Sequence, residues 1–284
     1  MGEMLFGELN GHAVGIILKE LVRRAIGVAR RERIAFEATT KESYAGTMDD
    51  VFTSADTKAQ AIYLRAFEEC FPACGVIAEE DSFTIETQNG CYFTIDPVDG
   101  TKAYVRRQSH GISTMVSLVV GGEVVAAFIG DINTGEIFGY RPGSDKVHRI
   151  TDLDSAERLS AEPPAELDIG KCHALLRDPL KNYSEMTEGL VGRCKNYEIM
   201  GSSIGTWAAR LWKREVSALF LTEGYETPWD STPIIGISKK LGYAFYRSTR
   251  NGWQVFEPQL PKTPVKRVHD LLIMHPALFA QTFR

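Results

Sequence analysis

An apolar strand pattern that stops at two acids is the feature that most constrains the fold of this chain. Residues Cys91–Ile95 are apolar and β-prone, and the chain continues as Asp96-Pro97-Val98-Asp99-Gly100-Thr101. A surface turn is one interpretation, because proline, aspartate and glycine are ordinary turn residues. A metal site is the other, because carboxylates clustered without histidine or cysteine favour hard cations such as Mg²⁺.

Three other acidic segments bear on this choice. They are Thr53–Asp56, Val76–Asp81 and Pro228–Pro233. Taken alone, Asp56 and Asp230 could each be a helix N-cap, and the acids of the second segment could lie in a solvated loop. Yet three of the four segments stand where a strand ends or a helix begins, which is where α/β sheets bind ligands. We therefore favour a magnesium site that binds a phosphate, to which Gly100 and Thr101 would offer backbone N–H groups.

The spacing of the two acids argues against one class of phosphatase. Enzymes that use an aspartyl nucleophile carry a D-x-D-G-T motif, with one residue between the acids. Here two residues, Pro97 and Val98, separate Asp96 from Asp99. Because one extra residue redirects a side chain, a covalent aspartyl-phosphate mechanism is disfavoured.

The remaining patterns predict a mixed chain in two halves. Helices are predicted over Ala13–Arg30, Asp56–Phe71, Ile204–Lys213 and Ser231–Leu241, the last ended by Gly242. Strands are predicted over Gly75–Ala78, Cys91–Ile95, Ser113–Val120, Glu123–Gly130, Ile137–Tyr140, Ala174–Leu176, Tyr197–Met200 and Val216–Leu221, with a hairpin at Gly121-Gly122. Thr39–Asp50 is predicted to be a mobile loop, and Arg141–Leu167 a polar connection. We expect an N-terminal half, 1–150, with the metal-binding loops, and a C-terminal half, 151–284, that supplies Asp230 and the substrate pocket, in one compact unit.

Composition excludes several other classes of protein. The net charge of −5 and the pI near 5.8 argue against nucleic-acid binding. No apolar stretch reaches the ~20 residues of a membrane span, and the first residues lack the pattern of a signal peptide. The five cysteines are odd in number and irregularly spaced, so a disulfide framework is not expected. We expect a cytoplasmic protein without a nucleic-acid or membrane partner.

Four elements together resemble the inositol monophosphatase family. They are Thr53-Ser54-Ala55-Asp56, Glu79-Glu80, Asp96-Pro97-Val98-Asp99-Gly100-Thr101 and Trp229-Asp230, in matching order and spacing from about Val51 to Gly242. The family belongs to the lithium-sensitive, Mg²⁺-dependent phosphatases, together with the bisphosphate nucleotidases and fructose-bisphosphatases. The resemblance implies an α+β fold built as a layered αβαβα sandwich, the fold of the sugar phosphatases.

The resemblance also implies two or three bound Mg²⁺ ions. One ion would be held by Glu79, Asp96 and the carbonyl of Val98. A second would be held by Asp96, Asp99 and Asp230, and a third, looser ion would lie near Glu79. Such clustered ions would clamp the entering and leaving oxygens of a displacement at phosphorus.

Catalytic roles follow from the same resemblance. Thr101, with Asp56 behind it, would orient the attacking water, and Glu79 would support catalysis through its metal. The backbone N–H groups of Asp99, Gly100 and Thr101 would bind the phosphate of the substrate. Charge neutralisation and positioning are the usual sources of rate in phosphoryl transfer.

Further pocket residues are implied beside Asp230. Gly205 and Trp207 match a family element that lines the substrate pocket, and the Trp207 ring could stack on a flat base. A competing alignment uses Gly201-Ser202-Ser203 instead. Glu223 either matches a family acid that binds substrate hydroxyls or is a surface acid at a strand end.

Three basic residues follow the metal-binding motif closely. Lys102, Arg106 and Arg107 are either solvated surface charges or, if they face the site, partners for a second phosphate or another anionic group. The sequence alone does not choose between these alternatives.

The predicted function is that of a Mg²⁺-dependent phosphomonoesterase acting on a small phosphorylated metabolite of the inositol monophosphate type. Hydrolysis would occur by direct attack of a metal-activated water. The alternatives are a 3′(2′),5′-bisphosphate nucleotidase, a histidinol-phosphate phosphatase and, less favoured, a non-catalytic regulatory relative. A Ca²⁺-binding module is disfavoured because no D-x-[DN]-x-[DN]-G loop occurs. A homodimer is left open.

Overall fold

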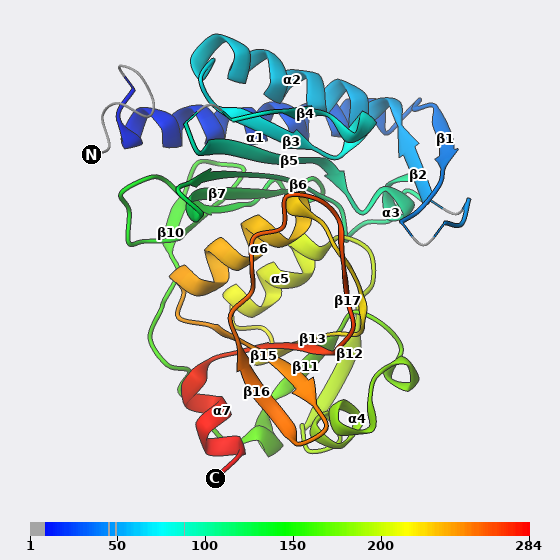
Figure 1. Ribbon diagram of the computed structural model, residues 1–284, viewed down its shortest axis with the longest axis vertical. Helices are drawn as coiled ribbons and strands as arrows, with labels where there is room; N and C mark the ends of the chain where they lie inside the picture. The colour runs from blue at the N-terminus through cyan, green and yellow to red at the C-terminus, as the bar shows by residue number, and fades with distance from the viewer. Residues whose placement is uncertain (1–8, 45, 49, 88) are drawn as a thin grey trace.

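The structure, a computed structural model, describes residues 9–44, 46–48, 50–87 and 89–284. Its helices are α1 (Gly11–Glu32), α2 (Ser54–Cys70), α3 (Thr101–Val105), α4 (Glu185–Val191), α5 (Ile204–Trp212), α6 (Pro228–Lys240) and α7 (Pro276–Thr282). Figure 1 shows α1 and α2 above a first sheet, α5 and α6 between this sheet and a second one, and α4 and α7 beyond the second. The predicted αβαβα sandwich is therefore confirmed.

The first sheet has eight strands and is mostly antiparallel. Its order is β10 (Ala156–Arg158), β9 (His148–Ile150), β8 (Ile137–Tyr140), β7 (Glu123–Asp131), β6 (Ser113–Val120), β5 (Cys91–Asp99), β3 (Gly75–Ala78) and β4 (Thr84–Ile85). Only β3 and β5 pair in parallel within the described strands of this sheet. The β6–β7 hairpin turns at Gly121-Gly122, as predicted, and both glycines have positive φ.

The second sheet has six strands. Its order is β12 (Asn196–Ile199), β11 (His173–Leu176), β13 (Ala218–Leu221), β18 (Leu271–Met274), β15 (Ala244–Thr249) and β16 (Gly252–Phe256). Leu175 and Leu219 belong to the core with α5 and α6, whereas Leu176 and Phe220 belong to the core with α4 and α7. Alternate residues thus point to opposite faces, and helices cover both. Two small sheets pair β1 (Ala38–Lys41) with β2 (Asp50–Thr53) and β14 (Gly224–Glu226) with β17 (Val265–Arg267).

Two helices begin earlier than predicted. Thr53, not Asp56, is the N-cap of α2, and Thr227, not Asp230, is the N-cap of α6. Each aspartate is instead the third residue of its helix. At the other end of α6, Gly242 adopts a φ of +77°, in agreement with the predicted helix stop.

Two segments predicted to be irregular contain strands. Thr39–Asp50 is not a loop throughout, because its ends belong to the β1–β2 arm, where β-branched residues favour strand pairing. Ala45 and Asp49 of this segment lie outside the described residues. The predicted connection Arg141–Leu167 includes β9 and β10, which extend the first sheet. The division into halves at residue 150 stays a prediction.

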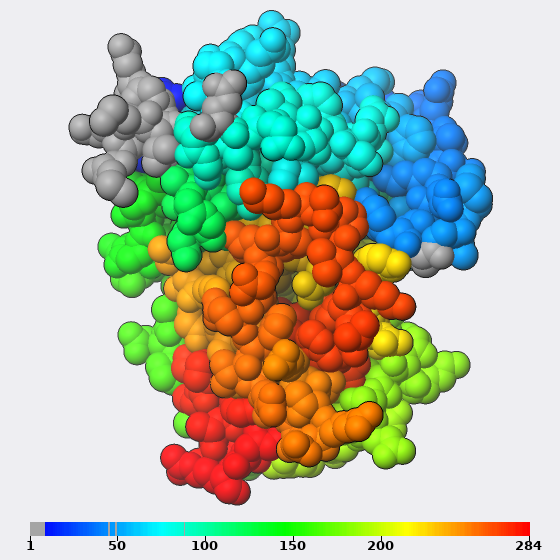
Figure 2. Space-filling view, in the orientation of Figure 1, coloured from blue at the N-terminus to red at the C-terminus, as the bar shows by residue number. Residues whose placement is uncertain are grey.

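The chain between β16 and β17 forms a strap between the layers. Figures 1 and 2 show it, in orange to red, running from the second sheet across α5 and α6 to the first sheet and back. Leu260 of the strap packs against core residues of the first sheet and of the α5–α6 layer, including Trp229. The Lys262 ammonium lies 5.7 Å from the centre of the Tyr92 ring in β5. The strap therefore joins both sheets close to the start of α6.

Two observations bear on the excluded classes. In the part of the chain that the structure describes, no helix combines the length and apolarity that a membrane crossing requires. All five cysteines are free. Residues 1–8, on which the expectation of no signal peptide rests, lie outside the described residues. The cytoplasmic location and the homodimer stay predictions.

Candidate active site

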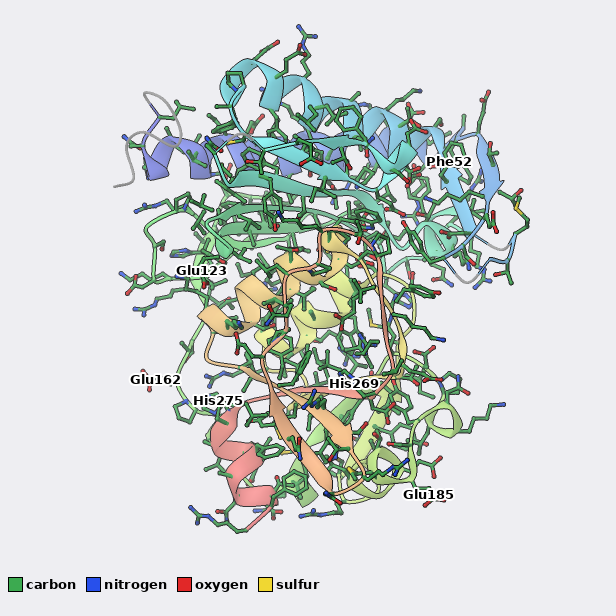
Figure 3. The ribbon with its side chains drawn as sticks, viewed as in Figure 1. Phe52, Glu123, Glu162, Glu185, His269 and His275 are labelled. Atoms are coloured by element: carbon green, nitrogen blue, oxygen red, sulfur yellow. The ribbon has the colours of Figure 1, made fainter. Side chains whose placement is uncertain are left out.

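A cavity of about 620 Å³ is lined by residues between Tyr44 and His110 and by residues between Arg177 and Asp230. It is lined by the end of β5, by α3, by the start of α6, by the β1–β2 arm and by residues that follow β11 and β12. A volume of this size is typical of small-molecule sites, which span ~300–1,000 Å³. Phe52 of β2 marks this end of the first sheet in Figure 3, whereas His269 and His275 lie at the second sheet and do not line the cavity.

Three carboxylates meet on one wall of the cavity. Ligand oxygens of Asp96, Asp99 and Asp230 all lie within 4.8 Å of one another. Residues three apart in a regular strand face opposite sides, but the pairing of β5 with β6 shifts register between Asp96 and Asp99. This irregularity lets both acids of β5 reach the cavity, where the first turn of α6 adds Asp230. The sequence motif identified all three residues.

The environment of Asp96 fits a bound cation. Its side chain is 2% exposed, and its Oδ1 has no hydrogen-bond partner among the described residues. Burial, and then the charges of Glu79, Asp99 and Asp230, raise the pKa of Asp96 well above its usual range. A buried carboxylate without a partner is unfavourable unless a cation neutralises it. The oxygen-only ligands of this cluster match the preference of Mg²⁺.

Asp99 is held by a dense set of donors. Its Oδ2 accepts hydrogen bonds from Ser113 Oγ at 2.9 Å, Ser203 Oγ at 2.6 Å and the Gly205 N–H at 2.8 Å. Its Oδ1 accepts from the Ile204 N–H at 3.1 Å. Asp99 thus faces the first turn of α5, where acceptors are favourable, and Oδ1 keeps capacity for a cation. The predictions did not include Ser113, and they named Ser203 only in the competing alignment of the pocket, although it stands in the N-cap position of α5.

Glu79 lies at the edge of the same wall and has a basic partner. Lys41 of the arm donates to Glu79 Oε1 at 3.2 Å and to Glu80 Oε1 at 3.1 Å. Burial raises the pKa of Glu79 to about 8, although the positive charge of Lys41 opposes this shift. Lys41 therefore occupies a place at Glu79 that a cation could take. No motif indicated this contact, because Lys41 belongs to the segment predicted to be a loop.

Thr101 lines the cavity, and Asp56 lies behind it. Thr101 Oγ1 lies 2.9 Å from the carbonyl oxygen of Val98 and 3.4 Å from Asp56 Oδ1, and it can donate to either. Asp56 is fully buried, and its Oδ2 accepts from both the N–H and the hydroxyl of Thr53. Burial raises the pKa of Asp56 to about 7, against the effect of the Thr53 hydrogen bonds. Gly100, with a φ of +91°, makes the turn that brings Thr101 back toward Val98.

Three residues assigned to the substrate pocket do not line the cavity. Trp207 is fully buried in the core beneath the first sheet, so its predicted stacking on substrate is not supported. Gly205 supports Asp99 instead, and a Cβ there would come within 2.4 Å of Ser113 Oγ. Glu223 is exposed and lies outside the cavity lining. Gly201 and Ser202, from the competing alignment, do line it.

Aromatic side chains form a second wall. Tyr44 of the arm lies 6.0 Å from Tyr225 and 6.4 Å from Trp229, measured between ring centres, and all three line the cavity. Trp229 is buried, but Tyr44 and Tyr225 are each more than 40% exposed, so their rings are available to a ligand. Trp229 belongs to a motif, whereas Tyr44 and Tyr225 were not predicted.

Basic side chains form a third wall, which we call the basic wall. It consists of Lys102, Arg106, His110 and Arg177. Arg107 is not part of it, because its guanidinium lies 5.9 Å from the centre of the Phe36 ring and donates to the Ile34 carbonyl. Of the three predicted basic residues, two therefore face the cavity, and Arg177 is an addition that no motif indicated.

Comparisons with known proteins agree with this architecture. Residues 12–259 match the model of the inositol monophosphatase family. The chain is 27% identical over 104 residues to the Nus factor SuhB of Escherichia coli (strain K12), and 27% identical over 123 residues to that of Vibrio cholerae serotype O1. These alignments cover 37% and 40% of this chain. They cover 37% and 46% of the relatives, so each match spans less than half of the curated protein.

Solved structures share the whole fold at low identity. An inositol monophosphatase (IMPase) of Thermotoga maritima has a TM-score of 0.73 at 17% identity, over 95% of this chain and 94% of that chain. SuhB of Bartonella henselae has a TM-score of 0.73 at 17% identity, over 96% and 99%. An IMPase/NADP phosphatase solved with Mg²⁺ and phosphate has a TM-score of 0.70 at 15% identity, over 95% and 94%. At such identities the likeness shows the fold alone.

Proposed function

This chain belongs to the inositol monophosphatase family, and from that premise we propose that it is a Mg²⁺-dependent phosphomonoesterase. The observation that carries the proposal is the burial of Asp96 next to two other carboxylates. Its carboxylate is buried beside Asp99 and Asp230, and its Oδ1 has no partner among the described residues. A cation held there relieves the repulsion among the carboxylates and provides a binding place for a phosphate.

The proposed cation ligands are Glu79, Asp96, Asp99, Asp230 and the carbonyl of Val98, for two or three ions. Bound Mg²⁺ would supply charge neutralisation at the phosphoryl oxygens and an activated water for direct attack. Asp99 would contribute Oδ1, because three hydrogen bonds already occupy Oδ2. Glu79 would offer Oε2 to a cation, because Lys41 donates to its Oε1.

Thr101 is the proposed positioning residue for the attacking water. Its hydroxyl has two acceptors in reach, the Val98 carbonyl and Asp56 Oδ1, and can donate a hydrogen bond to either. The lone pairs of Thr101 Oγ1 are then free to accept a hydrogen bond from water in the cavity. Asp56 supports this arrangement through its bonds to Thr53. The backbone N–H groups of Asp99, Gly100 and Thr101 are the proposed donors to the substrate phosphate.

The substrate is proposed to be a small phosphorylated metabolite, and the aromatic wall distinguishes two candidate kinds. A cyclitol phosphate of the inositol type offers hydroxyl groups but no flat face. A nucleotide, or the imidazole of histidinol phosphate, offers a flat face for the exposed rings of Tyr44 and Tyr225. Stacking of a base on an aromatic ring contributes ~1–3 kcal/mol. The bisphosphate nucleotidase and histidinol-phosphate alternatives are therefore retained as the second candidate function.

A phosphate-release assay tests the activity. Purified protein is incubated with inositol 1-phosphate, histidinol phosphate, fructose 1,6-bisphosphate or adenosine 3′,5′-bisphosphate, with Mg²⁺ or with EDTA. We expect Mg²⁺-dependent release from at least one of them, and little release by Asp96→Asn. The control is Glu223→Gln, because Glu223 is exposed and does not line the cavity. Absence of release from every substrate would favour a regulatory relative instead.

A further inference from the structure

Resting on the proposed phosphatase function, we propose that Arg177 binds a second anionic group of the substrate, distinct from the phosphate that reacts. This group would be a phosphate or a carboxylate carried by the same small molecule. Arg177 would then determine specificity, and the preferred substrates would be phosphomonoesters with a second negative charge.

The first observation is that one nitrogen of the Arg177 guanidinium lacks a hydrogen-bond partner among the described residues. Arg177 follows β11 and lines the cavity. Its Nη1 is shielded from solvent and has no hydrogen-bond partner, so no carboxylate or carbonyl of the described residues reaches this nitrogen. A shielded cationic donor without a partner is unfavourable. The planar guanidinium matches phosphate and carboxylate oxygens, which it can bind in pairs.

The position of Arg177 within the basic wall is the second observation. A Cβ added at Gly201 would lie 3.7 Å from the Arg177 carbonyl oxygen, so the two segments are neighbours. The next residue, Ser202, donates from its Oγ to the Gly111 carbonyl at 2.7 Å. Gly111 follows His110, and the other cations of the wall, Lys102 and Arg106, lie within α3 and directly after it. The basic wall is thus continuous from α3 to the end of β11.

The third observation is that this wall lies within reach of the carboxylates. Arg177 and Asp230 face the cavity from different segments, Arg177 directly after β11 and Asp230 in the first turn of α6. Both residues line one cavity of about 620 Å³. A small molecule with its reacting phosphate at Asp96, Asp99 and Asp230 can therefore place another anion at Arg177. With cations held at the carboxylates, both walls would attract anions, which favours a substrate with two negative groups over one with a single charge.

A matched pair of substrates tests the role of Arg177. Adenosine 3′-phosphate and adenosine 3′,5′-bisphosphate differ only in a second phosphate, and glycerol 3-phosphate and 3-phosphoglycerate differ in a carboxylate. The readout is the ratio of kcat/KM within each pair. We expect the wild-type protein to prefer the second anion in at least one pair. Arg177→Gln should lower that ratio by about 10- to 100-fold, the effect of one hydrogen bond to a charged group.

Two further variants make the result specific. Arg177→Lys keeps the charge but not the paired geometry, so its ratio should lie between those of the wild type and Arg177→Gln. Arg107→Gln removes a neighbouring arginine that contacts Phe36 outside the cavity, and its ratio should not change. If Arg177→Gln lowers kcat/KM equally for both members of each pair, Arg177 acts only as a counter-charge for Asp230, and the proposal is wrong.

A binding measurement separates this proposal from the proposed function. Titration calorimetry with Mg²⁺ compares the two adenosine ligands without requiring turnover. If no phosphate is released but Arg177→Gln removes tighter binding of the bisphosphate, the anion site holds and the phosphatase proposal fails. If phosphate is released and neither kcat/KM nor affinity depends on the second anion, the phosphatase proposal holds and the anion site fails.

Discussion

Helices α2 and α6 begin with the same local pattern and use it differently. Each has a threonine N-cap and an aspartate three residues later, in Thr53-Ser54-Ala55-Asp56 and in Thr227-Pro228-Trp229-Asp230. In α2 the aspartate turns back and accepts both the N–H and the hydroxyl of Thr53. In α6 the Thr227 hydroxyl accepts the Asp230 N–H, and the Asp230 carboxylate joins Asp96 and Asp99 at the cavity.

The difference between the two helix starts comes from what lies opposite them. Asp56 is enclosed, and beyond Thr53 it has Thr101 Oγ1 at 3.4 Å as a donor. Asp230 faces two further carboxylates of β5, which can give it no stabilising charge. The same capping signal therefore places one aspartate among donors and the other in a cluster of three carboxylates. The cluster of carboxylates is the one that can hold a cation.

The largest expected effect is the loss of activity in Asp230→Asn, which should exceed the loss in Asp56→Asn. Asp230→Asn should lower kcat by more than 100-fold at saturating Mg²⁺, because it removes a proposed metal ligand, and changes to supporting residues alone typically cause ~10–100-fold losses. Steady-state phosphate release, with Mg²⁺ varied, measures this effect. Retention of the wild-type rate by Asp230→Asn would mean that the carboxylate cluster does not hold the catalytic metal.

A smaller loss of kcat is expected for substitutions of Thr101 and of Asp56 behind it. Asp56→Asn and Thr101→Ala should each lower kcat by about 10- to 100-fold with little change in KM, because positioning of the water matters in the transition state. Thr101→Ser, which keeps the hydroxyl, is the matched control and should retain most of the activity. A rise in KM without loss of kcat in Thr101→Ala would instead make Thr101 a substrate-binding residue.

Much of the fold and the acidic part of the site could be predicted from local patterns in the sequence. The helical spacing of α1 and the apolar runs of β3, β6 and β8 were predicted nearly at their observed bounds. The motifs also named Asp96, Asp99 and Asp230, which the structure brings together. These features could be predicted because periodicity and motif spacing are short-range properties of the chain.

The other walls of the site could not be predicted, because they depend on contacts between distant residues. Ser203 reaches Asp99 across 104 positions, and Lys41 reaches Glu79 across 38. Arg177 simply follows a short strand, and nothing nearby marks it as part of a site. For Trp207 the motif was misleading. Its ring was predicted to line the substrate pocket, but the structure buries it in the core. Tertiary packing decided each of these cases.

In the absence of metal, Asp230→Asn should increase the stability of the protein, although the same substitution lowers its activity. Burial raises the pKa of Asp230 to about 6 and that of Asp56 to about 7. Both exceed the unfolded value of about 3.9, so the free energy of unfolding should fall as pH rises from about 4 to about 7. In EDTA at pH 8, Asp230→Asn should therefore raise Tm by about 2–4 °C, with little gain at pH 4.

Added Mg²⁺ then separates the two positions in the same thermal measurement. Mg²⁺ should raise the Tm of the wild type and of Asp56→Asn, because both keep the proposed ligands and a ligand that binds only the folded state stabilises it. It should raise the Tm of Asp230→Asn much less. Equal Mg²⁺ stabilisation of both variants would show that the ion binds away from Asp230.

The smallest expected effect concerns the two threonine caps. Thr53 is fully buried and bonds Asp56 through both its N–H and its hydroxyl, whereas the Thr227 hydroxyl accepts one longer bond, of 3.3 Å, from the Asp230 N–H. N-cap threonine substitutions lower the free energy of unfolding by ~0.5–2 kcal/mol. We expect Thr53→Val near the upper end of this range and Thr227→Val near the lower end, measured by urea denaturation in EDTA at pH 8. Equal losses would mean that the closed capping arrangement of α2 adds nothing to stability, and that the two helix starts differ only in what their aspartates bind.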